Sequence, residues 1–462
     1  MKNSSLLFSV FAASLWLAAS AHSQPCSLDL SFNPTLNTGA VVYAVALQPN
    51  GQILIGGAFN SIGNVTVSNV ARLNPDGTLD PTFNPGSAAD VGYVDTIAVQ
   101  KDGKVLAGGS FYSSSAAAPA NLARLNSDGT VDHSFDTNLY IDGPVNAVLV
   151  QSDDKILFGG GFVIVDFYLR RSVARLNSDG TLDTTFDACV ASSAGSGATA
   201  LALLSDGKIL AGGNFTFSNG MYRDGIARLG SCGDLDPLYA APPGVNAGAV
   251  VYTIALRSDE QVLLGGNFQS YRGFLRRGIV RLTTSGAVDS SFDPGTGIDN
   301  GTTIYTIALQ NDGKAIIGGT FNSYNGQTKH GVARINGDGS LDNICDSASG
   351  PDDAVGSFAI QTDGRILVAG KFASFNGVAR NGLARVNGDH LPFRLGPPNR
   401  LVSGQFQLTL FGENQARYAI EASSNLVHWV SLTNFTANGA ASLFVDPDVE
   451  FHSSRFYRAV LP

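Results

Sequence analysis

The sequence predicts an all-β protein, a seven-bladed β-propeller closed by its N-terminal strand and followed by a small β-sandwich-like module. Three observations support this class. Glycine supplies 54 of the 462 residues and proline another 18, so tight turns are frequent and strands are short. A Gly-Gly-x-Phe motif recurs at intervals of 51 to 53 residues. Finally, one strand of the repeated type stands alone near the N-terminus, where it can complete the last repeat.

Seven phenylalanines mark the repeat units. Each follows Gly-Gly-x, except that Ala369 replaces the first glycine of the last unit. An arginine lies 13 residues after each phenylalanine, so insertions and deletions fall outside this stretch. The marker residues are Phe59, Phe111, Phe162, Phe215, Phe268, Phe321 and Phe372.

Each unit is expected to form four short strands. In the first unit, two apolar segments flank Pro49-Asn50-Gly51 and two more flank Pro75-Asp76-Gly77, and both tripeptides are turn sequences. The expected strands are 41–48, 52–59, 70–74 and 79–83. Four short antiparallel strands per repeat are typical of a propeller blade, and the 3.6-residue apolar spacing of a helical solenoid is absent.

The second turn of each unit predicts an arginine–aspartate register. Pro75-Asp76-Gly77 suits a type I turn followed by a left-handed residue, which places Arg72 opposite Asp80. The same spacing predicts the pairs Arg72–Asp80, Arg124–Asp132, Arg175–Asp183, Arg228–Asp236, Arg281–Asp289 and Arg334–Asp342.

Arg385 has no such partner downstream, because residue 393 is Phe. Near the N-terminus, Leu28-Asp29-Leu30-Ser31-Phe32 is a fourth strand without the three that should precede it. We therefore expect Asp29 to pair with Arg385, which closes the ring and removes an open sheet edge.

The repeated motif resembles a known family. Residues 97–109 read Ile-Ala-Val-Gln-Lys-Asp-Gly-Lys-Val-Leu-Ala-Gly-Gly, and residues 123–132 read Ala-Arg-Leu-Asn-Ser-Asp-Gly-Thr-Val-Asp. This pattern resembles the delta-60 repeat β-propeller family of secreted bacterial proteins, over about residues 28–390. The resemblance implies architecture and export, and it carries no assigned catalytic residues. The fourth and seventh copies depart most in the second turn, at Ser231-Cys232-Gly233 and Asp389-His390.

The first 23 residues are predicted to be a signal peptide. Lys2 precedes an apolar run from Leu6 to Ala21, and Ala21-His22-Ser23 offers the small residues that signal peptidase requires. The run is shorter than the roughly 20 apolar residues of a membrane span, so we expect no transmembrane segment and a mature chain that begins at Gln24. The protein is then secreted or held at the cell surface.

The propeller is expected to occupy residues 24–398, and a second module residues 399–462. The repeat stops at Pro397-Pro398, and the remaining chain alternates like short strands. Residues 418–423, Trp429 and residues 455–458 resemble a small C-terminal β module found on secreted proteins of the Verrucomicrobia. Trp429 and Phe456 either form an aromatic sugar platform or belong to the core of this module, and the core role is favoured.

Composition and motifs argue against several chemistries. The net charge is -9, so there is no support for a nucleic-acid partner, which needs a basic face. The turns that begin at Asn74, Asn126 and Asn177 evoke calcium loops, but turn geometry explains their Asn, Asp and Gly without a metal. Histidines show no ligand spacing, and nucleotide-binding motifs are absent. We therefore expect no metal and no cofactor.

The cysteines give no assigned pairing. The sequence contains Cys26, Cys189, Cys232 and Cys345, and an exported protein permits disulfides. We expect Cys189 and Cys232 to lie at opposite ends of neighbouring blades, too far apart for a disulfide.

The long loops are the expected binding surface. The second connection within each blade and the link to the next blade should share one face. Second connections of blades three to seven are rich in arginine and aromatic residues, and the residues predicted to bind are Arg171, Arg223, Arg276, Arg277, Tyr222 and Tyr271. The inter-blade links are acidic, so the two sets of loops can also neutralise one another without any ligand.

The predicted function is recognition. We expect a secreted, monomeric, non-enzymatic recognition or scaffold protein that binds an extracellular polysaccharide or a protein partner on the long-loop face. One alternative is a glycosidase or lyase that uses loop carboxylates such as Asp299, Asp352 and Asp353. Another is a purely structural cell-surface propeller, and a fold alone does not decide among these.

Overall fold

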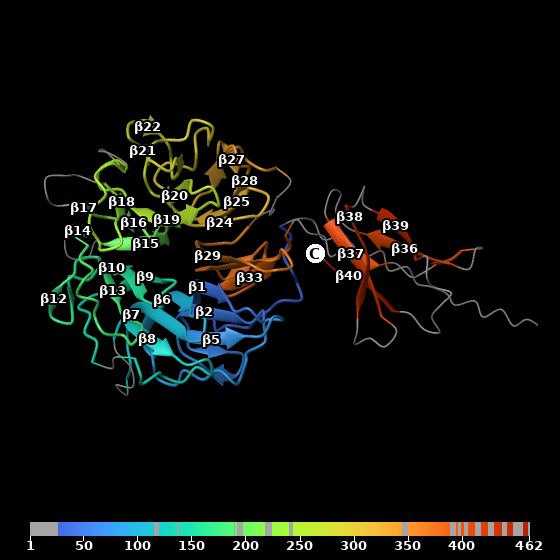
Figure 1. The fold of residues 1–462 in the computed structure, drawn as a ribbon, viewed down its shortest axis with the longest axis horizontal. Coiled ribbons are helices and arrows are strands. Elements are labelled where there is room, and N and C mark those ends of the chain that lie inside the picture. Colours follow the sequence, from blue (N-terminus) through green and yellow to red (C-terminus); the bar gives the residue numbers. More distant parts are fainter. Residues whose placement is uncertain are drawn as a thin grey trace, which may run out of the picture.

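Seven three-stranded antiparallel sheets follow one another along the chain and form a ring (Figure 1). The computed structural model describes residues 26–114, 120–135, 138–188, 190–191, 197–217, 224–239, 244–343, 350–388, 394–395, 399–401, 405–411, 417–423, 429–436, 441–446 and 456–460. All regular elements in these ranges are strands. No helix in the described ranges has the length and hydropathy needed to cross a membrane. The predicted signal peptide lies outside the described residues.

Each blade has an inner, a middle and an outer strand. In blade one these are β1 (Val41–Leu47), β2 (Ile53–Ala58) and β5 (Val70–Leu73). The other blades are, in order, β6 (Val91–Val99), β7 (Val105–Tyr112) and β8 (Leu122–Leu125); β9 (Val145–Val150), β10 (Ile156–Gly160) and β13 (Val173–Leu176); β15 (Ala198–Leu203), β16 (Ile209–Gly213) and β18 (Ile226–Leu229); β19 (Val251–Leu256), β20 (Val262–Gly266) and β23 (Ile279–Leu282); β24 (Ile304–Leu309), β25 (Ala315–Gly319) and β28 (Val332–Ile335); β29 (Val355–Ile360), β30 (Ile366–Gly370) and β33 (Leu383–Val386).

The hydrophobic core lies between neighbouring blades. Middle strands such as β10 and β20 are buried along their whole length, as expected for strands covered on both faces. One core cluster combines Ile316 and Val332 of blade six with Val368 of blade seven. Another combines Val42 of blade one with Leu367 of blade seven. Packing therefore continues around the ring.

The N-terminal segment closes the ring, as the sequence predicts. Leu28 forms a bridge with Val386 of β33, and the N–H of Asp29 donates to the carbonyl of Arg385 at 2.8 Å. The N–H of Cys26 donates to the carbonyl of Asn387 at 2.7 Å. Because β29 also packs against β1, the first and last blades are joined like any other neighbours.

The prediction of a full fourth strand is wrong in detail. After the turn, the fourth segment contributes an isolated bridge, such as Leu73 with Leu79, and one further hydrogen bond from Asp80 to Arg72. The chain then turns away, because the Asp80 carboxylate accepts hydrogen bonds from the N–H and the hydroxyl of Thr82 at 2.9 and 2.7 Å. A local side-chain turn thus ends the pairing.

The second connection holds a small hairpin that the sequence analysis did not anticipate. In blade one it consists of β3 (Ser61–Ile62) and β4 (Val65–Thr66). Equivalent hairpins are β11 (Ile164–Val165) with β12 (Tyr168–Leu169), β21 (Ser270–Tyr271) with β22 (Phe274–Leu275), β26 (Ser323–Tyr324) with β27 (Gln327–Thr328), and β31 (Ser374–Phe375) with β32 (Val378–Ala379). In blade four, β17 (Thr216–Phe217) pairs instead with β14 (Val190–Ala191).

These hairpins and the inter-blade links lie together. Link residues bridge to hairpin residues, as in Leu36 with Ile62 and Ile298 with Tyr324. We call the surface formed by these hairpins and links the long-loop face. Inner strands begin at this face, because each link leads directly into the next inner strand.

The C-terminal residues form two antiparallel sheets. In one, β36 (Phe406–Phe411) pairs with β34 (Arg394–Leu395), β35 (Asn399–Arg400) and β39 (Ala441–Asp446). In the other, β37 (Arg417–Ser423) pairs with β38 (Val430–Thr436) and β40 (Phe456–Val460). The hydroxyl of Tyr457 donates to Asp446 at 2.8 Å and so connects the two sheets. Strand β34 thus pairs with β36 although it precedes the expected boundary at 399.

Trp429 is half-buried in the C-terminal unit. The Arg458 guanidinium lies 4.3 Å from its ring centroid, and Arg458 also pairs with Glu421 at 2.7 Å. One face of Trp429 is therefore covered within the unit. Phe456 is 41% exposed.

Candidate functional site

A β-bulge recurs in the inner strand of every blade. In blade one, Val42 pairs with Gly57 and Ala44 with Gly56, so Tyr43 is left without a partner opposite it. A bulge of this kind redirects the extra side chain. The bulged residues stand 16 positions before each marker phenylalanine and are Tyr43, Asp95, Asn146, Thr199, Tyr252, Tyr305 and Gly356.

The bulge explains the Gly-Gly pair of the repeat. A Cβ on Gly57 would overlap the carbonyl oxygen of Val41, which the bulge brings close to the middle strand. A Cβ on Gly56 would lie 2.7 Å from Val94 in the next blade. The second glycine is therefore required by the bulge and the first by close packing of the blades.

All seven bulged residues line one cavity of about 450 Å³ at the centre of the ring. Val41, Ala354, Gly370 and Lys371 complete its wall. Since Val41 and Ala354 stand at the start of inner strands, the cavity forms the mouth of the central channel on the long-loop face. We call this site the channel mouth.

Tyrosines dominate the wall of the channel mouth. Tyr252 and Tyr305 meet edge to face, with ring centroids 5.0 Å apart. Tyr43 contacts Tyr93 at 5.7 Å, with the ring planes inclined by 58°. Such aromatic surfaces offer flat apolar faces next to polar hydroxyls.

Asp95 is the single carboxylate among the residues that line the channel mouth. Burial raises the pKa of its carboxyl to about 7. Burial also raises the pKa of Tyr43, and the nearby charges of Asp95 and Tyr93 raise it further. The side chains of Tyr43 and Asp95 are therefore close enough to interact electrostatically. Lys371 is 69% exposed at the rim and pairs with Asp353 at 3.5 Å.

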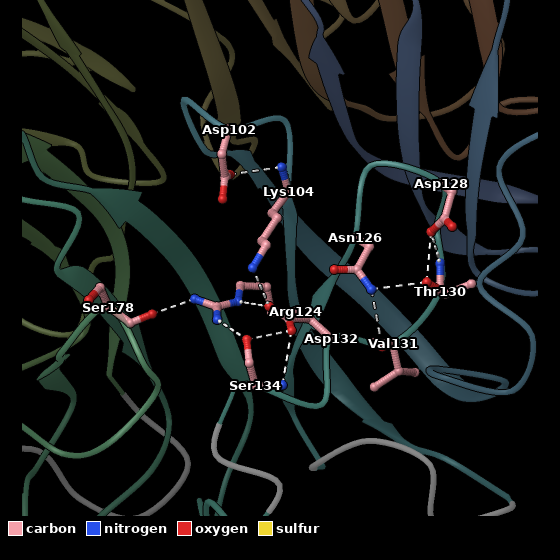
Figure 2. Close-up of polar contacts among 10 residues, drawn as sticks. All are labelled: Asp102, Lys104, Arg124, Asn126, Asp128, Thr130, Val131, Asp132, Ser134 and Ser178. Atoms are coloured by element: carbon pink, nitrogen blue, oxygen red, sulfur yellow. Dashed lines mark hydrogen bonds and ion pairs between the residues drawn. The ribbon is translucent and has the colours of Figure 1, made fainter.

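The predicted arginine–aspartate pairs hold the blades together rather than a ligand. In blade two, Arg124 donates to Asp132 at 2.7 Å and to the carbonyl of Ser178 in blade three (Figure 2). Its guanidinium also lies 4.6 Å from the ring centroid of Phe135. The equivalent bond to a carbonyl of the next blade is made by Arg72, Arg175, Arg228, Arg281 and Arg385.

The pairing recurs around the ring. The nitrogen–oxygen distances lie between 2.7 and 3.0 Å in Arg72–Asp80, Arg124–Asp132, Arg175–Asp183, Arg228–Asp236, Arg281–Asp289, Arg334–Asp342 and Arg385–Asp29. Burial tends to raise the pKa of Asp132, but hydrogen bonds from Lys104, Ser134 and Arg124 hold that pKa well below its usual range. These carboxylates are therefore ionised structural partners.

The turn aspartates whose sequence resembles calcium loops accept hydrogen bonds from residues of the same turn. The Asp128 carboxylate accepts hydrogen bonds from the N–H and hydroxyl of Thr130 at 3.0 and 2.7 Å (Figure 2). Asp76 and Asp179 make the same bonds to Thr78 and Thr181. Over the described ranges, no three His, Cys, Asp or Glu side chains gather in a way that could hold a metal ion.

The structure describes four of the six residues predicted to bind a ligand. Tyr271 is fully buried in the core, and its hydroxyl donates to the carbonyl of Gly286 at 3.1 Å, so the prediction that it contacts a ligand is wrong. Arg276 and Arg277 are half-buried, and Arg276 donates to the carbonyl of Leu275. Arg171 is exposed. Tyr222 and Arg223 lie outside the described residues.

The sequence pattern of the second connection explains this error. In blades one, three, five, six and seven the residue three positions after the marker phenylalanine is buried, and Tyr271, Tyr324 and Phe375 are examples. The exposed aromatic residues stand at the hairpin tips instead, as with Phe167, which is 87% exposed.

Link aspartates position the hairpins. Asp352 accepts hydrogen bonds from the N–H groups of Ala373 and Ser374 at 2.9 and 3.1 Å and from the Ser374 hydroxyl at 3.0 Å. Although burial tends to raise the pKa of Asp352, these bonds lower it. Asp299 caps Asn322 and Ser323 in the same way. Because its pKa is lowered, the Asp352 carboxyl is not suited to be the general acid that the glycosidase alternative needs.

The repeat units match a family model. The domain of unknown function (DUF5122) beta-propeller model matches residues 48–83, 100–135, 151–186, 204–239, 257–292, 310–343 and 361–389. These segments cover more than half of the chain. The chain belongs to the DUF5122 β-propeller family. The matches stop before the C-terminal unit.

This DUF5122 propeller is also similar to solved structures. An extracellular domain assigned to the hybrid two-component system BT4673 from B. thetaiotaomicron has 12% identity and a TM-score of 0.48, over 84% of this chain and 45% of that chain. The corresponding domain of BT3049 has 13% identity and a TM-score of 0.42, over 93% and 54%. YCF48 from Cyanidioschyzon merolae has 12% identity and a TM-score of 0.43, over 77% and 98%.

The chain thus spans about half the length of the two B. thetaiotaomicron domains. No curated protein matches the sequence.

The cysteines of this DUF5122 propeller differ in state. Cys26 is disulfide-bonded, and Cys232 is a free, exposed thiol. The expectation that the Cys232 turn lies far from the end of blade three is wrong, because the N–H of Asp187 donates to the carbonyl of Cys232 at 3.0 Å. Cys189 and Cys345 lie outside the described residues.

The sequence analysis missed the channel mouth as a site, although a signal was present. The bulged residue always stands 16 positions before the marker phenylalanine, so the seven residues could have been collected from the repeat alignment. Three of them are tyrosines and the others are Asp, Asn, Thr and Gly, whereas the residues around them repeat. A repeat position whose residue type varies while its neighbours repeat is the sequence signal that could have indicated this site.

Proposed function

We propose that this chain is an exported recognition protein that binds an extracellular polysaccharide at the channel mouth and does not catalyse a reaction. The observation that carries the proposal is the 450 Å³ cavity whose wall is built from seven bulged residues, one from each blade. Concave sites with aromatic walls and a few polar groups are typical of small-ligand recognition.

The side chains at the channel mouth suit a sugar. Tyr43, Tyr252 and Tyr305 offer rings against which an apolar sugar face can pack. Asn146 offers both hydrogen-bond donors and an acceptor. The hydroxyl of Thr199 donates to the carbonyl of Val251 at 2.6 Å, so its oxygen is left to accept a bond from a ligand hydroxyl.

The rigid scaffold supports binding. The residues on both sides of every bulged residue pair with the middle strand, so little conformational entropy is lost when a ligand binds. A cavity of this size takes a chain end or a short segment of polysaccharide, whereas a protein partner generally needs about 800 Å² on each side. These features favour a polysaccharide over a protein partner.

The proposal keeps the predicted long-loop face and places the principal contacts inside the channel mouth. Arg171, Arg276 and Arg277 remain proposed secondary contacts on the same face, which an anionic polysaccharide would reach. Export through residues 1–23 remains part of the proposal, on the segment pattern described above.

The number and the hydrogen bonding of the carboxylates near the channel mouth support a function without catalysis. Glycoside hydrolysis generally uses two carboxyl groups about 5 to 10 Å apart. Asp95 is the single carboxylate in the lining of the channel mouth, and Asp352 is held by three hydrogen-bond donors of its own blade. Recognition without hydrolysis is therefore the function that this geometry favours.

A glycan array with the mature chain tests the proposal. We expect wild-type protein to bind a defined set of glycans and Tyr252→Ala/Tyr305→Ala to lose at least tenfold in affinity for them. Tyr168→Ala, on the exposed strand β12 of the same face, is the matched control and should bind as wild type. Equal binding by both variants would contradict the site, and release of reducing sugar by wild type would support the enzyme alternative.

A further inference from the structure

Asp95 is a carboxylate with no counter-charge. Within the described residues no hydrogen bond or ion pair reaches it, and burial is the one cause of its raised pKa. Desolvating an ionised carboxylate is costly unless a partner compensates it. A ligand group is therefore the natural source of compensation.

The elements around Asp95 supply no such partner. Strand β6 packs against β1, β2, β7 and β9. The titratable groups on these strands are Tyr43 on β1, Tyr93 on β6 itself and Tyr112 at the end of β7, and all are tyrosines. Lys371 lines the channel mouth from blade seven, but its ammonium pairs with Asp353 at the rim.

The tyrosines beside Asp95 favour a cation. Tyr43 and Tyr93 meet at 58° with centroids 5.7 Å apart, so their rings form two sides of a corner near the carboxylate. An ammonium group is attracted to the negative face of an aromatic ring, and more strongly when both are desolvated. A net charge of -9 adds a long-range attraction for cations.

We propose that the channel mouth recognises an amino sugar through its protonated amine, which pairs with the Asp95 carboxylate and lies against the rings of Tyr43 and Tyr93. This inference rests on the proposed function, whose ligand it narrows to polysaccharides with free amino groups. The rest of the sugar then faces Tyr252 of blade five and Tyr305 of blade six, on the other side of the propeller from Asp95 in blade two.

The wall chemistry favours an ammonium over a metal cation. Calcium takes about six to eight oxygen ligands, and magnesium prefers an octahedron of oxygens. Asp95 offers the single carboxylate of the lining, and the rings of Tyr43 and Tyr93 lie beside it. Ring faces with one carboxylate match the needs of an organic ammonium group.

The pH dependence follows from the carboxylate. An ammonium binds the ionised form of Asp95, and the pKa of about 7 means that this form becomes dominant above neutrality. For a ligand whose charge does not change with pH, affinity should rise about tenfold between pH 6 and pH 8, in proportion to the ionised fraction.

Two pairs of probes test the proposal on the mature chain by isothermal titration. The tetramer of glucosamine has free amines, and the tetramer of N-acetylglucosamine is its neutral counterpart. Choline has a permanent charge, and 3,3-dimethylbutan-1-ol is its uncharged isostere. We expect at least tenfold preference for the glucosamine tetramer at pH 7, and choline binding that rises with pH while the isostere does not bind.

Asp95→Asn should abolish both the amine preference and the pH dependence. Asp363→Asn makes the same change at an exposed carboxylate outside the channel mouth, so it should keep both. The choline titration of wild type needs no variant and decides the point even if Asp95→Asn fails to fold.

The outcomes separate the two proposals. Equal affinity for the two tetramers, with no preference for choline over its isostere, overturns the amine inference and leaves polysaccharide recognition standing. Binding of choline that rises with pH, without binding of any oligosaccharide, supports the cation site and overturns the polysaccharide proposal. Wild type that binds none of the four probes and no arrayed glycan overturns both.

Discussion

The guanidinium of Arg385 donates to the carboxylate of Asp29 at 2.8 Å, although 356 residues separate them in the sequence. The same guanidinium donates to the carbonyl of Pro75 in blade one at 2.6 Å and lies 4.5 Å from the ring centroid of Phe32. One arginine thus joins the N-terminal segment, blade seven and blade one.

Removing Asp29 should open the ring. We expect Asp29→Ala to lower the free energy of unfolding by about 3 to 5 kcal/mol, because it leaves a buried arginine without its anion. Thermal or urea unfolding of the mature chain measures the change. Asp363→Ala, at an exposed carboxylate, is the control and should change stability by less than about 0.5 kcal/mol. An unchanged melting curve for Asp29→Ala would refute closure by this segment.

Stability should fall in acid. Although burial tends to raise the pKa values of Asp80 and Asp289, hydrogen bonds from neighbouring hydroxyls and arginines hold them below the usual range. A carboxyl whose pKa is lower in the folded state contributes stability above its unfolded pKa of about 3.9 and loses it as pH falls further. We expect the melting temperature to drop steeply below about pH 4. A melting temperature that is level from pH 5 to pH 2 would contradict this role of the pairs.

Asp95→Asn should have the opposite dependence on pH. The pKa of Asp95 is raised to about 7, so the folded state resists the ionisation that the unfolded state permits above about pH 3.9. The substitution removes this penalty, and we expect about 4 kcal/mol of added stability at pH 8 and no more than about 0.5 kcal/mol at pH 4. Urea unfolding at the two pH values measures this. An equal effect at both would show that Asp95 is not desolvated.

The disulfide partner of Cys26 is predicted from the repeat. Cys26 has φ 63° and occupies the turn position that Gly77 holds in blade one, where a Cβ would meet the ring of Phe32 in the preceding blade at 2.9 Å. Cys345 replaces the corresponding phenylalanine of blade six. We therefore expect a Cys26–Cys345 disulfide, worth about 2 to 5 kcal/mol. Peptide mapping without reductant checks it, and a Cys26–Cys189 peptide would contradict the register argument.

Tyr271 should behave as a core residue. We expect Tyr271→Ala to cost about 3 to 5 kcal/mol, as for other large buried aromatics, and Tyr271→Phe about 0.5 to 1.5 kcal/mol through the lost hydrogen bond to Gly286. Urea unfolding measures both. If Tyr271→Phe instead weakened glycan binding without loss of stability, the original prediction of a ligand contact would be restored.

The parts of the fold that the sequence predicts are those that repeat. Phe59, Arg72 and Asp80 recur because every blade needs the same packing and the same ion pair, so periodicity reveals them. The early end of the fourth segment was not predicted, because it depends on a local bond between Asp80 and Thr82 that competes with strand pairing.

The candidate site is harder to predict because it lies where the repeat varies. Tyr43 and Asp95 occupy the same position in different blades but share no chemistry, so a search for conserved motifs passes over them. Their convergence depends on the bulge and on ring closure, which are properties of the whole chain. The sequence analysis selected the loop arginines as ligand contacts because arginine is frequent in those loops. The frequency of a residue type does not indicate which side chains line the same cavity.

Filling the channel mouth tests the central claim most directly. Gly356 is the bulged residue of blade seven, and a Cβ there would meet nothing within 4 Å. Gly356→Trp should therefore occupy the cavity without disturbing the blades, and Ala379→Trp, on the exposed part of β32 in the same blade, is the matched control. We expect Gly356→Trp to keep the wild-type melting temperature and to lose glycan binding by at least tenfold, while Ala379→Trp binds normally. Undiminished binding by a folded Gly356→Trp protein would contradict the claim that the channel mouth is the binding site.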